Sequence, residues 1–385
     1  MKGLATFGAP MILYGTGASQ RTGEYARSYG RKALLVTDTH LDEIGILEGI
    51  KESLRDARVG FALFDGVVTE PIMEYVEEGL RLFHQNTCEL IISVGGGSPM
   101  DTGKAISVLA TNKGSMRDFE GINNIPNSGI PHIAIPTTAG TGSEVTAATI
   151  ITDSARDVKM LTMSPHIVPR IALVDPQLTL QCPPNITAST GLDALTHAVE
   201  ASVSVKAHPI TDALSLHAIT LISQNLPQAW SDGTNIEART HMMTAALEAG
   251  LAFSNASVAL VHGMARPLGA YFHIPHGIAN AALLAPVVEF SIPGNPGRYA
   301  HITQAMGEKT HGLSPMDAAY LAAKAVRRLV EGLKIPSLKG LEVDEEKFNT
   351  VVEQMAKDAL ASGSPHNNPR KASVKEIVEL YRKAY

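Results

Sequence analysis

The chain has 385 residues, of which 44% are hydrophobic and 18% charged, with a formal net charge of −6 at pH 7. The acidic balance and the lack of a long basic stretch argue against a nucleic-acid partner, and no apolar run is long enough to predict a membrane span. Two cysteines, Cys88 and Cys182, are too few for a disulfide framework. Because the N-terminus also lacks the apolar core of a signal peptide, we expect a cytoplasmic protein, and the length predicts two domains.

The first half of the chain alternates short apolar runs with helical patterns. The runs end in turn residues and suit strands buried on both faces; they cover residues 32–38, 61–67, 90–97, 132–138 and 171–176. Helical patterns lie between several of them, as in residues 70–86 and 99–112. This alternation predicts a doubly wound, parallel α/β sheet. Residues 148–160 predict one further strand and a turn.

The second half predicts an all-helical domain. Strand signals become rare, and Ala- and Leu-rich periodic stretches cover residues 188–205, 209–226, 235–253, 256–269, 315–333 and 345–360. The two prolines of "QCPPN" (181–185) interrupt either kind of element. We therefore expect an α/β domain over residues 1–180 and a helical domain over residues 181–385.

A glycine-rich segment, "SVGGGSPMDTGKA" (93–105), ends one predicted strand and opens a helix. Glycines let the backbone approach a ligand closely, and a helix N-terminus offers free N–H groups to an anion such as a pyrophosphate. The segment matches neither the Rossmann nor the Walker pattern. A tight structural turn at residues 95–97 is the alternative.

Two further features point to a dinucleotide at the same end of the sheet. "PTTAGTGSEVT" (136–146) is a second loop rich in glycine and hydroxyl groups, although Thr141 or Ser143 could simply cap the next helix. Asp38 ends the first strand, where a carboxylate could bind an adenosine ribose and repel a 2′-phosphate, which favours NAD over NADP. An ordinary helix N-cap is the alternative for Asp38.

The segment "DALTHAVEA" (193–201) places Asp193 and His197 on one helix face, because they are four residues apart. A solvated face or a capping pair is the alternative. Downstream, "VHGMARPLGAYFHIPHG" (261–277) adds His262 on a second helix and His276 in a loop bounded by proline and glycine. One carboxylate and three imidazoles would suit a divalent first-row metal, Fe²⁺ or Zn²⁺.

With these segments the chain resembles the iron-dependent (group III) alcohol dehydrogenase family over essentially its full length. The resemblance is carried by GGGSPMDTGKA, PTTAGTGSEVT, GLDALTHAVEA, HGMARPLGA, IPHGIANA and the C-terminal NNPRKASVKEIVELYRKAY. It implies that the metal ligands are Asp193, His197, His262 and His276. It implies that the cofactor contacts are Asp38, Gly95, Gly96, Gly97, Ser98, Asp101, Thr137, Thr138, Thr141, Ser143 and Lys159.

The resemblance implies an NAD(P)-linked interconversion of small alcohols and aldehydes on an architecture like that of dehydroquinate synthase, with Fe²⁺ favoured over Zn²⁺. Metal and nicotinamide would act together on one substrate carbon and its oxygen, and we expect them in a cleft between the domains. A metal-assisted lyase and a non-catalytic nucleotide-binding protein on the same fold are the alternatives. The resemblance also implies a homo-oligomer, a dimer or larger, for which residues 5–15 could supply an edge strand.

The chain departs from the family pattern at Arg266, where a histidine is usual. A guanidinium does not ligate such metals, and four residues beyond His262 it would point the same way. Arg266 could hold an anionic substrate group, or it could pair with a structural acid; the sequence slightly favours the acid. Glu70 replaces a usual asparagine near the cofactor. Phe253 and His273 are further candidate substrate contacts, with core packing and surface exposure as their alternatives.

Overall fold

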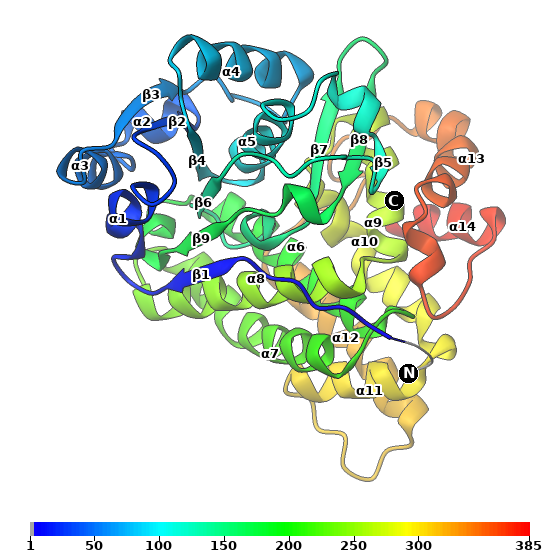
Figure 1. The fold of residues 1–385 in the computed structure, drawn as a ribbon. Coiled ribbons are helices and arrows are strands. Elements are labelled where there is room, and N and C mark those ends of the chain that lie inside the picture. Colours follow the sequence, from blue (N-terminus) through cyan, green and yellow to red (C-terminus); the bar gives the residue numbers. More distant parts are fainter. Residues whose placement is uncertain (1–3) are drawn as a thin grey trace. The chain divides into compact units, whose positions relative to one another are not determined.

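The computed structural model describes residues 4–385 (Figure 1). Its contacts separate the chain into two compact units. One unit is Gly8–Cys182. The other is Pro183–Tyr385 together with residues 4–7. Cys88 and Cys182 do not form a disulfide bond with each other.

The first unit is built on a six-stranded, wholly parallel sheet in the order β1-β9-β6-β4-β2-β3. Its strands are β1 (Met11–Tyr14), β2 (Lys32–Val36), β3 (Gly60–Phe64), β4 (Leu90–Gly95), β6 (His132–Pro136) and β9 (Ile171–Val174). The five predicted strands are confirmed. β1 lies within the segment predicted as an edge strand, and it pairs inside the chain with β9.

Helices cover both faces of this sheet, as the continuously apolar strands require. They are α1 (Thr22–Ala26), α3 (Glu48–Asp56), α4 (Met73–Gln85) and α5 (Gly97–Leu109), while the short helix α2 (Thr39–Glu43) has no buried residue. Leu34 and Ile91 pack in the core under α4 and α5, whereas their neighbours Leu35 and Ile92 pack in the core under α1 and α3. Alternate residues of each strand therefore fill two separate cores, which confirms the doubly wound fold.

A smaller sheet joins β5 (Gly121–Ile122), β8 (Val158–Met163) and β7 (Ala148–Asp153). β7 and β8 form an antiparallel hairpin, so the predicted strand and turn are confirmed and continue into a second strand. Asp101 of α5 accepts a hydrogen bond from the backbone N–H of Ile150 at 2.9 Å. This bond ties the hairpin to the helix that follows the glycine-rich segment.

The second unit is helical throughout its described length. Its helices are α6 (Pro184–Val203), α7 (Pro209–Ser231), α8 (Ile236–Ala256), α9 (Leu260–Phe272), α10 (His276–Ser291), α11 (Pro296–Ala305), α12 (Pro315–Gly332), α13 (Glu345–Ala361) and α14 (Val374–Ala384). The six predicted helical stretches are confirmed. The periodicity did not predict α10, α11 or α14. In α10 the reason is plain, since apolar residues surround the whole helix and leave no amphipathic period.

The same apolarity gives residues 276–294, which comprise α10 and the turn after it, the length and hydropathy of a membrane span. No membrane span was expected here, because the sequence has no uninterrupted apolar run of sufficient length. In the structure 56% of this stretch is buried, and α10 packs against α6, α9, α12 and α14. Packing inside the helical unit therefore accounts for its composition.

Candidate active site

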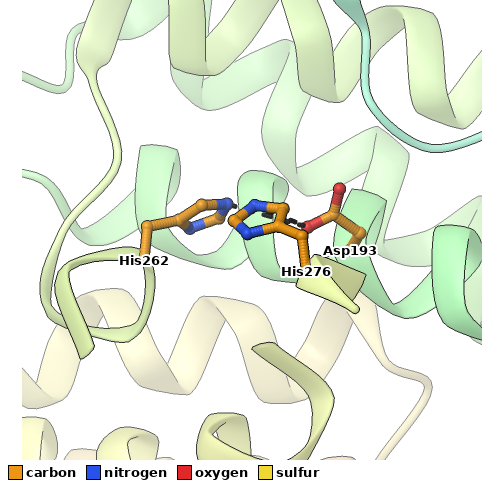
Figure 2. A group of neighbouring side chains, drawn as sticks. All are labelled: Asp193, His262 and His276. Carbon is orange, nitrogen blue, oxygen red and sulfur yellow. Dashed lines mark ion pairs between the residues drawn. The ribbon is translucent and has the colours of Figure 1, made fainter. Parts of the chain in front are cut away.

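Three side chains from three helices converge within the helical unit (Figure 2). They are Asp193 of α6, His262 of α9 and His276 of α10, and one ligand atom of each lies within 4.8 Å of the others. The Nε2 atoms of His262 and His276 each lie 3.7 Å from Asp193 Oδ1. Asp193 and His262 are buried, whereas the His276 side chain is 39% exposed. The cluster is thus open on one side.

The placement of His276 differs from the prediction. The flanking proline and glycine predict a loop, but His276 is the first residue of α10, directly after the N-cap Pro275. A Cβ on the next residue, Gly277, would lie 2.4 Å from the carbonyl oxygen of Ser189 in α6. A glycine at this position therefore lets the two helices approach closely enough for His276 to join Asp193.

Glu200, which the sequence analysis did not single out, fixes the orientation of His262. The His262 Nδ1–H group donates to Glu200 Oε2 at 2.6 Å. The carboxylate also accepts from the backbone N–H groups of Ala259 (2.8 Å) and Val261 (2.5 Å). With the proton held on Nδ1, the lone pair of Nε2 is directed toward Asp193, which is the arrangement that metal-ligating histidines use.

Asn280, also missed, lies one helical turn after His276 and is fully buried. Its Nδ2 atom is 2.6 Å from Asp193 Oδ1, 3.2 Å from His262 Nε2 and 3.1 Å from His276 Nε2. Its Oδ1 atom is buried without a hydrogen-bond partner among the described residues. Three acceptor atoms thus converge on one amide group, and such a set of acceptors suits a cation.

His197 lies beside the cluster rather than in it. Its Nδ1 atom is 3.9 Å from Asp193 Oδ2, and its ring stacks on the rings of His262 (4.5 Å between centroids) and Phe253 (4.1 Å). Phe253 of α8 is partly buried and packs with a small alanine cluster of α6 and α8 as well. The structure therefore brings Phe253 to the edge of the group formed by Asp193, His262 and His276.

The two remaining candidates on α9 differ in surroundings. Arg266 lies one turn beyond His262 and is partly buried. His273 is exposed and forms the left-handed C-cap of α9, where its backbone N–H donates to the carbonyl of Gly269. His273 is not part of the three-residue group.

In the sheet unit the glycine-rich segment borders a cavity of about 290 Å³. The cavity is lined by Asp38, His40, Val67, Val68, Thr69, Gly96, Gly97, Ser98 and Pro99. It lies at the carboxyl ends of β2 and β4. The connection from β2 runs toward β3 and that from β4 toward β6, so the strand order reverses between them, and ligands of open α/β sheets bind at such a point.

The glycine-rich segment and Asp38 show features of both interpretations offered for them, namely a structural turn or helix cap and a ligand site. Gly95 has a φ of +152°, and a Cβ there would lie 2.6 Å from Pro99 Cγ, so this glycine serves the turn itself. Gly96 is the N-cap of α5, whose first N–H groups have no acceptor within the helix. Asp38 is the N-cap of α2 and accepts from the N–H of Leu41 at 2.9 Å, while it also lines the cavity.

The second loop packs against the first. A Cβ on Gly97 would lie 3.2 Å from Thr141 Cγ2, and one on Gly96 would lie 3.5 Å from Thr138 Oγ1. The Thr138 hydroxyl is buried without a hydrogen-bond partner among residues 4–385. Thr137 is buried as well, and its N–H donates to the carbonyl of Gly95 at 3.0 Å. The unpaired hydroxyl next to the glycine segment favours a bound polar ligand there.

Other predicted cofactor contacts are engaged with protein groups. Ser143 Oγ donates to Asp101 Oδ1 at 2.6 Å and accepts from Lys104 Nζ at 2.8 Å. The fully buried Lys104 also donates to Thr146 Oγ1 and to the carbonyl of Ala148. Lys104, missed by the sequence analysis, therefore holds the second loop against α5.

Lys159 of β8 forms an ion pair with Glu70 at 2.5 Å. Glu70 is the residue that departs from the family pattern. Its carboxylate thus engages the lysine to which the resemblance gives a cofactor contact.

Beside Lys104, the buried Glu144 leads to a prediction about stability. Burial raises the pKa of its carboxyl to about 7, whereas the unfolded chain ionises near 4.5. Above pH 4.5 the native state therefore holds a proton that the unfolded state releases, so this group lowers the free energy of unfolding as the pH rises toward 8. Glu144→Gln removes the effect. We expect the stability of the variant relative to the parent to increase by roughly 2 kcal/mol between pH 5 and pH 8, measured by urea unfolding.

Exposed Glu346→Gln serves as the matched control, because its carboxylate lies at the surface of α13. Its stability relative to the parent should be the same at both pH values. An equally flat difference for Glu144→Gln would contradict the prediction.

Comparison with known proteins agrees with this geometry. The model of the family "Iron-containing alcohol dehydrogenase" matches residues 9–176, and that of "Fe-containing alcohol dehydrogenase family, C-terminal" matches residues 187–385. The chain is 43% identical to 1,3-propanediol dehydrogenase of Citrobacter freundii, over 97% of this chain and 96% of that protein. It is 39% identical to NAD-dependent methanol dehydrogenase of Bacillus methanolicus, over 97% and 98%. The crystal structure of a 1,3-propanediol oxidoreductase gives a TM-score of 0.97 at 41% identity and covers 100% of both chains.

The chain belongs to the iron-containing alcohol dehydrogenase family. Within that family it is a metal-dependent oxidoreductase of alcohols and aldehydes. The predicted family, fold and class of reaction are thereby confirmed, and oxidoreduction is favoured over the lyase alternative.

Proposed function

We propose that the protein is an NAD(H)-linked alcohol dehydrogenase and aldehyde reductase whose divalent metal is held by Asp193, His262 and His276, with His197 as the fourth ligand. The observation that carries the proposal is the convergence of three ligand atoms within 4.8 Å, one of them oriented by Glu200. His197 stacks on His262, and its Nδ1 lies 3.9 Å from Asp193, so a small side-chain rotation is expected on metal binding.

The residues present fit a metal ion. Among the described residues the ion-pair partners of Asp193 are histidines, so no lysine or arginine neutralises this buried carboxylate. A buried charge without a cation is costly, and a divalent ion would supply one. When bound, such an ion polarises the substrate oxygen as a Lewis acid. We infer Fe²⁺ as the resident ion from the family, with Zn²⁺ compatible with the same ligands.

The chain's own residues supply orientation. Glu200 keeps the proton of His262 on Nδ1, and Asn280 holds the Asp193 carboxylate in place from a buried position. His276 is the partly exposed member of the group and marks the side from which an alcohol or aldehyde enters. Phe253, stacked on His197, gives this entrance an apolar wall suited to a short carbon chain.

The cofactor is assigned to the cavity at the switch point of the sheet. The helix N-terminus at Gly97 and Ser98 suits a pyrophosphate, and the nicotinamide supplies or accepts the hydride. The remaining predicted contacts are assigned to shaping or lining the same site; they are Asp101, Thr137, Thr138, Thr141, Ser143 and Lys159. The relatives named above act on small alcohols, one of them with NAD, which supports a short-chain alcohol or aldehyde as the substrate.

The Asp38 carboxylate is expected to set the preference for NADH over NADPH. Asp38→Asn keeps an N-cap for α2 but removes the charge that would repel a 2′-phosphate. The ratio of kcat/KM for NADPH to that for NADH should rise about tenfold or more, measured with propanal on the Fe²⁺-loaded protein. Asp42→Asn on the same helix is the control, since Asp42 pairs with Lys51. An unchanged ratio for Asp38→Asn would contradict the assignment of this cavity.

Assembly is proposed to be homo-oligomeric. β1 is an edge strand of the sheet, with Met11 57% and Tyr14 42% exposed, and an exposed edge strand is a common place for a second copy to pack. The mass in solution, measured by light scattering, tests this point. A monomer at micromolar concentration would contradict it.

A further inference from the structure

Arg266 is a positive charge on the helix that carries a metal ligand. It lies four residues after His262 on the continuous helix α9, so the two side chains share one face. It is partly buried rather than exposed. An arginine is not a ligand for a metal cation, because its guanidinium carries donors only.

No structural acid in the described part of the chain pairs with this arginine. Within residues 4–385, no hydrogen bond or ion pair joins the Arg266 side chain to another residue. Glu200 is the carboxylate whose charge acts on it, but Glu200 is already engaged by Ala259, Val261 and His262. Asp358, on the neighbouring helix α13, accepts from the hydroxyl of Tyr271 at 3.1 Å. The acid partner that the sequence slightly favoured is therefore absent from the described structure.

An unpaired guanidinium at a partly buried position is energetically unfavourable. Burial removes water from the charge, and the pKa of Arg266 is lowered for that reason. The guanidinium nevertheless stays charged in proteins, so it cannot relieve this cost by losing its proton. An anion supplied from outside the chain would relieve it, and a guanidinium binds carboxylate, phosphonate or sulfonate groups through two parallel hydrogen bonds.

The short distance between Arg266 and His262 along α9 limits the length of such a ligand. Side chains four residues apart on a helix face have Cβ atoms about 5 to 6 Å apart. A substrate whose oxygen lies beside His262 would therefore reach Arg266 with an anionic group a few carbons from its carbonyl. A long-chain or cationic substrate would not suit this neighbour.

We propose that Arg266 is a specificity-determining residue that binds the anionic group of a short aldehyde or hydroxy acid, so that the substrate class is aldehydes bearing a carboxylate, phosphonate or sulfonate. This inference rests on the proposed function, because it places the substrate at the metal-ligand group. The hydride transfer itself is unchanged, since the aldehyde carbon gains the hydride of NADH and its oxygen gains a proton.

The test compares charged aldehydes with neutral ones of similar size. We would measure kcat/KM for 4-oxobutanoate against butanal, and for 2-oxoethanesulfonate against propanal, using Fe²⁺-loaded protein of determined metal content and NADH. The charged member of each pair should be preferred about tenfold or more, and Arg266→Gln should abolish the preference. Arg266→Lys should restore part of it, since the charge returns without the planar fork. The two pairs show whether a carboxylate or a sulfonate is the better fit.

Arg327→Gln is the matched control, because it removes a positive charge from the same unit at an exposed ion pair with Glu289. It should keep the preference of the parent. A second readout does not depend on turnover: 4-hydroxybutanoate should raise the thermal midpoint of the metal- and NADH-loaded parent more than 1-butanol does, and Arg266→Gln should lose that difference.

Failure of this inference is distinguishable from failure of the proposed function. If neutral aldehydes are reduced as well as charged ones and Arg266→Gln leaves the ratios unchanged, Arg266 does not select the substrate, although the dehydrogenase assignment stands. If no aldehyde is reduced by the metal-loaded protein, the proposed function fails. In that case equal thermal shifts with 4-hydroxybutanoate and 1-butanol overturn the role of Arg266 as well.

Discussion

Replacing His262 with alanine is expected to empty the metal centre and to remove at least about 99% of the alcohol dehydrogenase activity. His262 supplies one of the three converging ligand atoms, and its loss also leaves the buried Glu200 without its imidazole partner. Each tenfold loss of rate corresponds to about 1.4 kcal/mol, so the expected effect is about 3 kcal/mol or more of transition-state stabilisation. The measurements are metal per chain by elemental analysis and kcat/KM with propanal and NADH.

His217→Ala is the control for this prediction. His217 lies on α7 of the same unit, is more than half exposed and pairs with Glu248 at the surface. The variant should retain the metal content and activity of the parent. If His262→Ala kept both its metal and its activity, the assignment of the centre would be wrong.

The second large effect, a loss of metal affinity, is expected at Glu200. This residue would act on the metal only by positioning the ring of His262. Glu200→Gln keeps the size of the side chain but turns one acceptor oxygen into an NH₂ group. That group would face a backbone N–H of Ala259 or Val261, so the His262 ring would lose its fixed orientation. Substitutions of such supporting carboxylates typically cost about 10-fold to 100-fold in metal affinity.

The dissociation constant for Zn²⁺, measured by competition with a chromophoric chelator, tests this second effect directly. Glu248→Gln is the matched control, because it alters a partly buried carboxylate that also pairs with a histidine, His217, but lies outside the group of converging ligand atoms. Its affinity should stay that of the parent. An affinity for Glu200→Gln equal to the control's would mean that Glu200 serves the fold and not the metal.

Much of the fold could be predicted because its signals are local. The parallel strands are continuously apolar and end in turn residues, and most helices of the second unit show a clear period. α10 could not be predicted in this way, since its apolar residues are spread around the whole helix and leave no distinct polar face. The placement of His276 failed for the same reason, because the helix it begins was not recognised.

The sequence pointed to Asp193, His262 and His276, which the structure brings together, but it did not point to the residues that support them. Asp193 and His197 attract attention as polar residues of an apolar helix. Glu200 lies seven residues beyond Asp193, on the same face of α6, and that spacing was an available signal. Asn280 likewise follows His276 by four residues. What sequence could not show is that Glu200 contacts the start of α9, since that contact joins residues about sixty positions apart.

Arg266 illustrates a different limit. The sequence shows a cation where the family has an imidazole, but whether an acid faces it depends on neighbouring helices that no local pattern describes. In the structure the two nearby acids bind other groups: Glu200 binds Ala259, Val261 and His262, and Asp358 binds Tyr271.

The most direct test of the central claim is a crystal structure of the Fe²⁺-loaded protein with anomalous diffraction measured at the iron edge. The account predicts one strong peak per chain at about 2.0 to 2.3 Å from Asp193 Oδ1 and from the Nε2 atoms of His262 and His276, with His197 turned toward it. A peak at any other position, or metal-loaded crystals without a peak among these side chains, would contradict it.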